Sequence, residues 1–228
     1  MSPSPPITVL LAEDHMVVRE GLLKLLEIEC DIEVIGQAVT GRQAVDMTGT
    51  LHPAVVVMDI AMPQFNGVEA TRQIRQAFPD VKVLILSAHS DDAYVETAME
   101  LGAAGYLIKQ TSAHCLSEAI REVHKGNTFF SPAIAKRYHK RHQTSLDRKG
   151  SSKKKITRLS SREMEVLQLI AEGEANKQIA AELGISIKTV EKHRDHLMQK
   201  LDIHDTAGLT RHAIATGVIE SSVQVTIV

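Results

Sequence analysis

Residues 54–63 read Ala-Val-Val-Val-Met-Asp-Ile-Ala-Met-Pro and are the most informative segment of the chain. Its valine-rich apolar run is typical of a strand buried on both faces of a parallel sheet. The run ends in a single carboxylate, Asp59, and a loop with Pro63 and Gly67 follows. In open α/β sheets, ligands bind beyond the carboxyl ends of the strands. Asp59 therefore has the position expected of a residue that carries chemistry.

Four further segments have the composition of strands, and three of them end in polar side chains. The segments are residues 7–11, 33–37, 81–86 and 105–108, and the polar residues are Glu13 and Asp14, then Ser87, then Lys109. Apolar residues at helical spacing lie between the strands, marked by Val17, Leu22, Leu25 and Leu26 and later by Val68, Ile74 and Ala77. Strands that alternate with helices predict βαβ units and a parallel α/β sheet of five strands.

The polar groups at these strand ends suggest a site for a hard cation and a phosphate. Glu13, Asp14 and Asp59 would repel one another unless a cation lay among them. Mg²⁺ accepts one or two carboxylates together with water and phosphate oxygens. Ser87 would then offer a hydroxyl, and Lys109 a positive charge, to phosphoryl oxygens. Such a site can transfer a phosphoryl group to a carboxylate by positioning and charge neutralisation.

Each of these residues also has an ordinary explanation. An aspartate after an apolar run is commonly a turn former. Glu13 and Asp14 could cap the helix that begins near His15. Lys109 could be a solvated loop residue, and Tyr106 could serve only in packing. Each ordinary explanation is the commoner one by itself, but the set recurs at the ends of four strands, which favours a common site.

Residues 7 to about 125 resemble the receiver domain of two-component response regulators, whose fold is flavodoxin-like. The resemblance implies that Asp59 is the phosphoacceptor, that Glu13 and Asp14 are the acidic pair, and that the main-chain carbonyl of Ala61 is a ligand to Mg²⁺. It also implies that Ser87 and Tyr106 are the switch residues and that Lys109 is the family's lysine. Many receivers have proline after this lysine, whereas this chain has Gln110. A cis bond before a non-proline residue costs about 3 kcal/mol, and the pattern leaves the isomer open.

The other informative segment lies near the carboxyl end and predicts four helices. The first covers residues 163–172, and residues 159–163 form its start. The others cover residues 176–183, 186–201 and about 205–216. Ser160 and Glu163 have the spacing of a capping box, and Gly173 and Gly184 follow helices as expected of stop signals. Two helices joined by a short turn with glycine indicate a helix-turn-helix motif. Residues 159 to about 216 closely resemble the LuxR-type DNA-binding domain of the NarL/FixJ family, an all-α domain of four helices.

The helix over 186–201 has two unlike faces at 100° per residue. We expect one face to pack on the helices behind it; this face has Val190, Leu197 and Leu201, flanked by Ile187 and by His193 as a packed histidine. We expect the opposite face to meet base edges in the major groove; it carries Lys188, Glu191, Lys192 and Asp195. Contacts to phosphates are expected from Lys177, Ser186 and Thr189. The ordinary alternative is a solvated face of charge pairs.

Charge separates the chain into three regions. Residues 1–127 have nine basic residues (Lys or Arg) and 17 acidic residues (Asp or Glu), so their net charge is −8. Residues 128–158 have ten basic residues and one acidic residue, a net charge of +9. Residues 159–228 have seven basic and ten acidic residues, a net charge of −3. These regions are the expected receiver domain, basic flexible linker and DNA-binding domain. Cys30 and Cys115 lack metal or redox spacing, and no signal peptide or transmembrane stretch is found, so we expect a cytoplasmic protein.

The basic linker has three possible uses. The run Lys153-Lys154-Lys155 could contact DNA phosphates, because the module after it is net acidic and phosphate neutralisation contributes much to affinity. It could instead hold the acidic receiver in an inhibited arrangement. The ordinary explanation is that the charges keep a linker solvated.

These patterns predict a DNA-binding transcriptional regulator controlled by phosphorylation, not a dedicated enzyme. The resemblance implies a sensor histidine kinase as phosphodonor, double-stranded DNA as target and a homodimer on DNA. We expect the helix over about 205–216, which carries Ala207, Leu209, Ala213 and Ile214, to form the two-fold contact. The alternative is that this face packs only within its own domain. A phosphatase of the haloacid dehalogenase type would need a second acid where Ala61 stands. A scaffold that is never phosphorylated would not need the acidic site.

Overall fold

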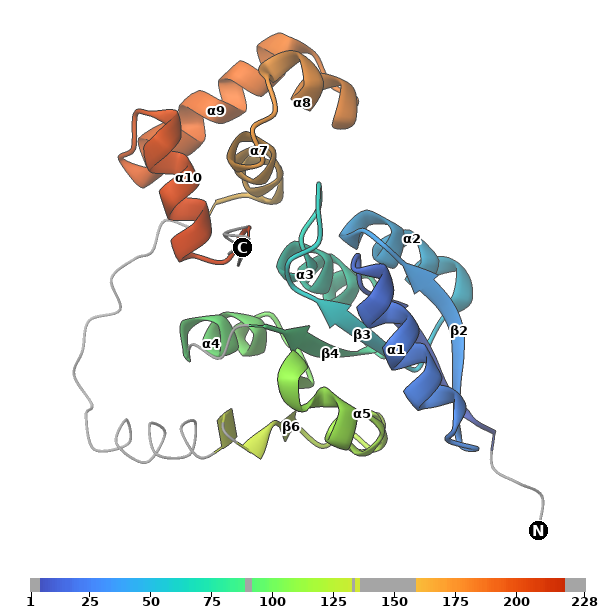
Figure 1. The fold of residues 1–228 in the computed structure, drawn as a ribbon. Helices are drawn as coiled ribbons and strands as arrows, with labels where there is room; N and C mark the ends of the chain where they lie inside the picture. The colour runs from blue at the N-terminus through green and yellow to red at the C-terminus, as the bar shows by residue number, and fades with distance from the viewer. Residues whose placement is uncertain (1–4, 89–91, 133, 136–158, 220–228) are drawn as a thin grey trace, which may run out of the picture. The chain divides into compact units, whose positions relative to one another are not determined.

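The computed structural model describes residues 5–88, 92–132, 134–135 and 159–219. The chain forms two compact units, one up to Lys154 and one from Lys155 onward. Figure 1 shows the course of the chain through both. Most of the expected linker, including the run Lys153-Lys154-Lys155, lies outside the described residues.

The first unit is built on a parallel sheet with the strand order β2-β1-β3-β4-β5-β6. The strands are β1 (Ile7–Ala12), β2 (Ile32–Ala38), β3 (Val55–Asp59), β4 (Lys82–Ser87), β5 (Gly105–Ile108) and β6 (Phe129–Phe130). The five expected strands are confirmed. The chain passes from β2 across β1 to β3, so the order reverses there, and the crevice beyond the ends of β1 and β3 is where such sheets bind ligands.

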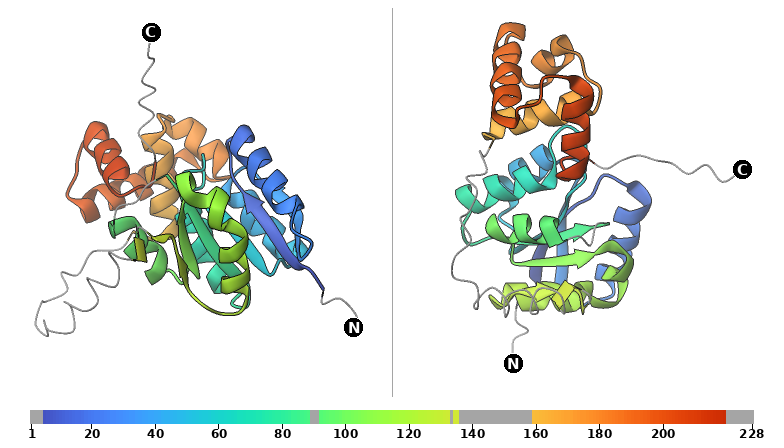
Figure 2. Two further views of the ribbon diagram at one scale, coloured as in Figure 1. Left: turned by 60° about the horizontal axis from the view of Figure 1, so that its bottom comes forward. Right: turned by 90° about the vertical axis from the view of Figure 1, so that its left-hand side faces the viewer.

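Helices cover both faces of this sheet. They are α1 (Met16–Glu27), α2 (Gly41–Leu51), α3 (Gly67–Ala77), α4 (Asp92–Glu100) and α5 (Lys109–His124). The core residues of α1 and α5 pack on one face, and those of α2, α3 and α4 pack on the other. In the right-hand view of Figure 2, α1 (dark blue) and α3 (teal) lie on opposite sides of the strands. The residues of β3 are buried throughout, as its apolar run predicts.

Two apolar residues expected to face the core do not. The side chain of Val17 is 82% exposed, and Ala77 is also exposed, whereas Leu22, Leu26 and Ile74 are buried as expected. Val17 lies in the first turn of α1, close to the turn that follows β1. Helical periodicity identifies a face but cannot say how far along the helix a partner extends.

A sixth strand, β6, comes from the segment that the charge pattern assigned to the linker. Phe129 and Phe130 pair in parallel with Gly105 and Tyr106 of β5. A Cβ atom on Gly105 would lie 2.5 Å from the carbonyl oxygen of Phe129, so the close approach of β6 requires glycine there. Ile134 follows and is buried in the same core as Tyr106. The receiver core therefore includes residues beyond position 127.

The second unit is the expected all-α domain of four helices. They are α7 (Ser161–Ala171), α8 (Asn176–Glu182), α9 (Ile187–Leu201) and α10 (Thr206–Ala215). The capping box of Ser160 and Glu163 is formed, with a 2.7 Å bond from the backbone N–H of Ser160 to the Glu163 carboxylate. Gly173 and Gly184 adopt positive φ angles of 95° and 64° after their helices, as expected of stop residues.

The core of the second unit corrects two expectations. Leu209 and Ala213 of α10 are completely buried in the core of their own domain, so the prediction that they form a contact between two copies is wrong. The α10 helix needs an apolar face to pack on α7, and these residues supply it. Ile187 is 44% exposed and His193 is half-buried, whereas Val190 and Leu197 are buried as expected. Every helix in the described part of the chain is too short or too polar to cross a membrane.

Candidate phosphoacceptor and DNA-binding sites

Three strand ends meet at one buried charged cluster in the receiver unit. Asp59 closes β3, Glu13 follows β1, and Lys109 follows β5. Both carboxylate side chains are fully buried. Nζ of Lys109 lies 2.8 Å from Oδ2 of Asp59 and 2.9 Å from Oε2 of Glu13. The expected convergence of these three residues is present, and the lysine lies between the two acids.

The pKa of Asp59 is raised from its ordinary 3.8 to about 7. Burial is the largest cause, and the charge of Glu13 adds to it, while Lys109 and a 3.3 Å hydrogen bond from the backbone N–H of Ala61 act in the opposite direction. Burial also disfavours the charged form of Lys109, but its two carboxylate partners outweigh burial and raise its pKa. The lysine therefore remains cationic, and the site holds one more acid than it can neutralise.

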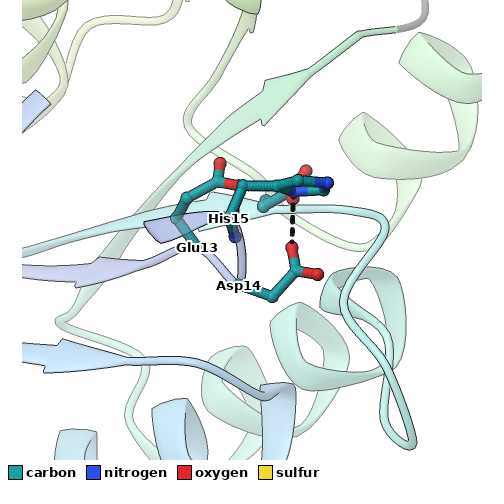
Figure 3. Close-up of side chains that lie close together, drawn as sticks. Glu13, Asp14 and His15 are labelled. Carbon is teal, nitrogen blue, oxygen red and sulfur yellow. Dashed lines mark hydrogen bonds and ion pairs between the residues drawn. The ribbon is translucent and has the colours of Figure 1, made fainter. Parts of the chain in front are cut away.

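The turn between β1 and α1 adds Asp14 and a residue that the sequence patterns did not single out, His15. Nδ1 of His15 lies 3.0 Å from Oδ1 of Asp14 and 3.1 Å from Oε1 of Glu13. Figure 3 shows these three side chains gathered at the turn. Burial lowers the pKa of His15, but both acids outweigh it and leave the pKa raised. The sequence pattern places His15 only at the start of a helix, so it does not identify the imidazole as part of the charged cluster.

The cluster has the donors that a divalent cation needs. Glu13, Asp14, His15 and Asp59 each offer one atom, and these atoms lie within 4.8 Å of one another. Two buried carboxylate oxygens, Oε2 of Glu13 and Oδ1 of Asp14, accept no hydrogen bond from the described residues. Each has a basic neighbour instead: Lys109 lies 2.9 Å from the first oxygen and His15 lies 3.0 Å from the second. Carboxylate oxygens are the ligands that Mg²⁺ prefers, so the residues present fit this ion.

The remaining receiver residues of interest lie on the strands beside Asp59. Ser87 is buried at the end of β4, one residue beyond Leu86, which pairs with Asp59. Tyr106 is fully buried in the core that also contains Val95 and Ala98 of α4, and its backbone pairs with Phe130 of β6. The Lys109–Gln110 peptide bond is trans.

A glycine at the start of α3 permits the packing of that helix against the site. A Cβ atom on Gly67 would lie 1.8 Å from the carbonyl oxygen of Asp59. The backbone N–H of Gly67 donates to the carbonyl of Ile60 at 2.9 Å. The first residue of α3 thus sets the distance between this helix and Asp59.

In the second unit, α9 presents an exposed polar face. It contains the expected residues Lys188, Glu191, Lys192 and Asp195, and it continues with His196 and Gln199. The six residues form two rows at i,i+4 spacing, 188-192-196 and 191-195-199. His196 and Gln199 were missed, although the same periodicity extended by one turn would have found them.

The residues expected at phosphates lie around the start of α9. Ser186 is its N-cap and accepts a 3.1 Å bond from the backbone N–H of Thr189, and the two side-chain oxygens lie 2.8 Å apart. Lys177 is exposed near the start of α8. A further residue, Arg194, bonds to Asn176 of α8 and Thr206 of α10 at 3.3 and 2.7 Å, which ties the three helices together.

Comparison with known proteins assigns a family to each of the two units. Residues 9–121 match the family model of the response regulator receiver domain, and residues 157–213 match that of the bacterial regulatory proteins of the luxR family. The transcriptional regulatory protein DegU of Brevibacillus brevis is 36% identical, with 92% of this chain and 94% of DegU covered. The chain belongs to the LuxR-type response regulators. LiaR of Bacillus subtilis is a further relative, 40% identical over 87% of this chain and 92% of its own.

Solved response regulators have a similar fold over the parts of the chain that they cover. A LuxR-family regulator from an Aurantimonas species is 33% identical and gives a TM-score of 0.58, covering 60% of this chain and 99% of that one. RcsB of Salmonella typhimurium is 25% identical with a TM-score of 0.55, covering 93% of this chain and 100% of RcsB. RcsB has also been solved in complex with DNA, and that structure gives a TM-score of 0.59 at 25% identity, covering 91% of this chain and 98% of RcsB.

Proposed function

We propose that Asp59 accepts a phosphoryl group from a sensor histidine kinase and that this modification controls dimerisation and binding of double-stranded DNA by the second unit. The observation that carries the proposal is the buried Asp59 carboxylate held 2.8 Å from the Lys109 ammonium at the edge of a parallel sheet. Membership of the response regulators argues against the phosphatase and scaffold alternatives. A DNA-bound regulator would act in the cytoplasm.

The chemistry assigns one role to each residue. An oxygen of ionised Asp59 attacks phosphorus, the bond from phosphorus to the donor nitrogen breaks, and the electron pair leaves with that nitrogen. Lys109 remains charged beside the phosphoryl oxygens, and the hydroxyl of Ser87 is available to them. Glu13, Asp14, Asp59 and the main-chain carbonyl of Ala61 would hold Mg²⁺, which neutralises phosphoryl charge when bound.

Formation of the acyl phosphate on Asp59 then changes the contacts of Lys109 and Ser87. Lys109 exchanges its bond to a carboxylate for one to a more highly charged group, and Ser87 moves toward the same group. Tyr106 is the neighbouring bulky side chain on β5, so we propose that Ser87 and Tyr106 change position together and alter the surface formed by α4, β5 and α5.

DNA binding is proposed for the polar face of α9. Lys188, Glu191 and Lys192 would read base edges, and Lys177, Ser186 and Thr189 would contact phosphates. A structure of two RcsB dimers bound to two parallel DNAs supports a dimer on DNA. Since Leu209 and Ala213 are buried, a two-fold contact by α10 would use its exposed side, which includes Ala207 and Arg211.

Mass spectrometry after incubation with a small-molecule acyl phosphate and Mg²⁺ tests the receiver assignment. We expect a single phosphoryl adduct that is absent from Asp59→Asn and absent when Mg²⁺ is chelated. The matched control is Asp46→Asn, which changes an exposed aspartate of α2 and should leave labelling intact. Undiminished labelling of Asp59→Asn would refute the assignment.

A further inference from the structure

The turn that carries the acidic pair is held by a side chain from the helix that follows. Nη1 of Arg19 lies 2.8 Å from the carbonyl oxygen of Glu13 and 3.3 Å from that of Asp14. Arg19 is half-buried, and its backbone N–H bonds to the carbonyl of His15 in the first turn of α1. Its side chain therefore reaches back over the first helical turn to the segment between β1 and α1.

Arg19 lies at the amino end of α1, where the dipole of the helix disfavours a positive charge. Arg19 is the fourth residue of α1. The amino end of a helix carries a partial positive charge, which disfavours cations there. The first turn of α1 contains no acidic residue, and its N-cap, His15, makes no side-chain capping bond. The described contacts of the guanidinium are with the turn, so its role concerns the turn.

The guanidinium contacts carbonyl oxygens of the turn and does not pair with its carboxylates. Among the described residues, Arg19 forms no ion pair with the side chain of Glu13 or Asp14. A cation paired with those carboxylates would compete with a metal ion. A cation bound to the backbone fixes where the turn places the carboxylates and does not itself occupy their oxygens. On the strand side, the backbone N–H of Glu13 is held by the carbonyl of Ala38 at 3.0 Å.

We infer that Arg19 is a positioning residue that sets the acidic pair, Glu13 and Asp14, for a divalent cation. The inference rests on the proposed function only in taking a divalent cation as the group bound there. Arg19 acts through the main chain of the turn and touches no reacting atom.

The sign of the effect separates this role from plain electrostatics. Arg19→Gln removes a positive charge close to a cation site, and Coulomb repulsion alone then predicts tighter metal binding. Loss of positioning predicts weaker binding, because the carboxylates are no longer held where the ion needs them. Residues that orient metal ligands without touching the metal change affinity by about tenfold or more, so the positioning effect should dominate.

The experiment titrates the full-length protein with Mn²⁺, as a spectroscopic substitute for Mg²⁺, and follows free Mn²⁺ by electron paramagnetic resonance. For Arg19→Gln we expect a dissociation constant about tenfold higher than that of the unmodified protein. Arg19→Lys keeps a donor near the carbonyls and should bind close to normally. The matched control is Lys24→Gln, which removes an exposed cation from the same helix that pairs with Glu27.

A second measurement is the melting temperature of the metal-free variants. Unchanged or tighter Mn²⁺ binding by a folded Arg19→Gln protein overturns the inference, and so does a loss of affinity equal to that of Lys24→Gln. If Arg19→Gln does not fold, Arg19→Lys and Arg19→Met are compared in its place, and equal affinity in both overturns the inference. Mn²⁺ titration involves no phosphoryl transfer, so its result is independent of whether Asp59 proves to be the phosphoacceptor.

Discussion

The ammonium of Lys109 lies 2.8 Å from the carboxylate of Asp59, although the strands that precede them, β5 and β3, are separated in the sheet by β4. The lysine side chain therefore crosses the end of β4 to reach the acid. It also contacts Glu13 beyond β3, at 2.9 Å. One cation thus holds together the ends of three strands and compensates the charge that phosphorylation would increase.

Replacement of Lys109 should impair phosphorylation more than folding. In Lys109→Gln, Asp59 and Glu13 face each other without a cation, so the pKa of Asp59 rises further and the phosphoryl oxygens lose their partner. We expect labelling by an acyl phosphate to slow by about 100-fold or more. The control is Lys125→Gln, which changes an exposed lysine at the other end of α5. An equal labelling rate in both variants would exclude a role for Lys109 in the reaction.

The raised pKa of Asp59 predicts a pH-dependent effect on stability. Because the pKa is about 7 in the folded protein and ordinarily 3.8, the folded state binds this proton more tightly than the unfolded state. The contribution of Asp59 to stability is therefore fully present below pH 4 and is lost as the pH rises toward 7. Asp59→Asn carries no such ionisation.

The measurement is the melting temperature with a chelator present. At each pH, the melting temperature of the unmodified protein is subtracted from that of Asp59→Asn. We expect this difference to be larger at pH 8 than at pH 5. A difference between the two proteins that does not change with pH would show that Asp59 ionises normally.

The packing of the segment after α5 predicts that the receiver needs residues beyond position 127. Ile134 is 1% exposed and lies in the receiver core. We expect Ile134→Ala to lower the free energy of unfolding of the receiver by about 2–5 kcal/mol, since it leaves a cavity. The matched control is Ile28→Ala, because that side chain is 81% exposed and its loss should change stability by less than about 0.5 kcal/mol. Urea denaturation measures both, and equal effects would mean that Ile134 is not part of the core.

The two sides of α10 should respond differently to charge. Leu209→Asp buries a carboxylate in the core of the second unit and should unfold it. Ala207 is exposed, so Ala207→Asp should leave the domain folded and weaken binding to paired half-sites if this side forms the two-fold contact. Circular dichroism reports folding, and gel shifts on duplexes with one and two half-sites report pairing. Normal binding of Ala207→Asp to paired half-sites would place the dimer contact elsewhere.

Local sequence determined most of the elements of this protein. The apolar run before Asp59, the capping box of Ser160 and Glu163 and the glycines after α7 and α8 act within a few residues. Their structural meaning depends on backbone conformation and on hydrogen bonds between neighbouring residues, which the local sequence specifies. The positions of the strand ends then predicted that Glu13, Asp59 and Lys109 lie in one site, because parallel strands bring their carboxyl ends to one edge.

Tertiary structure alone decided which surfaces are covered and which side chains reach the site. Two residues of β6 are too few to show a period, and their pairing depends on the absence of a side chain at Gly105. Leu209 and Val17 both lie on helices with an apolar pattern, yet one is buried by α7 and the other meets solvent. The contacts of Arg19 depend on the direction of its side chain across the first turn of α1. Periodicity specifies a face of a helix, and only packing in three dimensions specifies what that face meets.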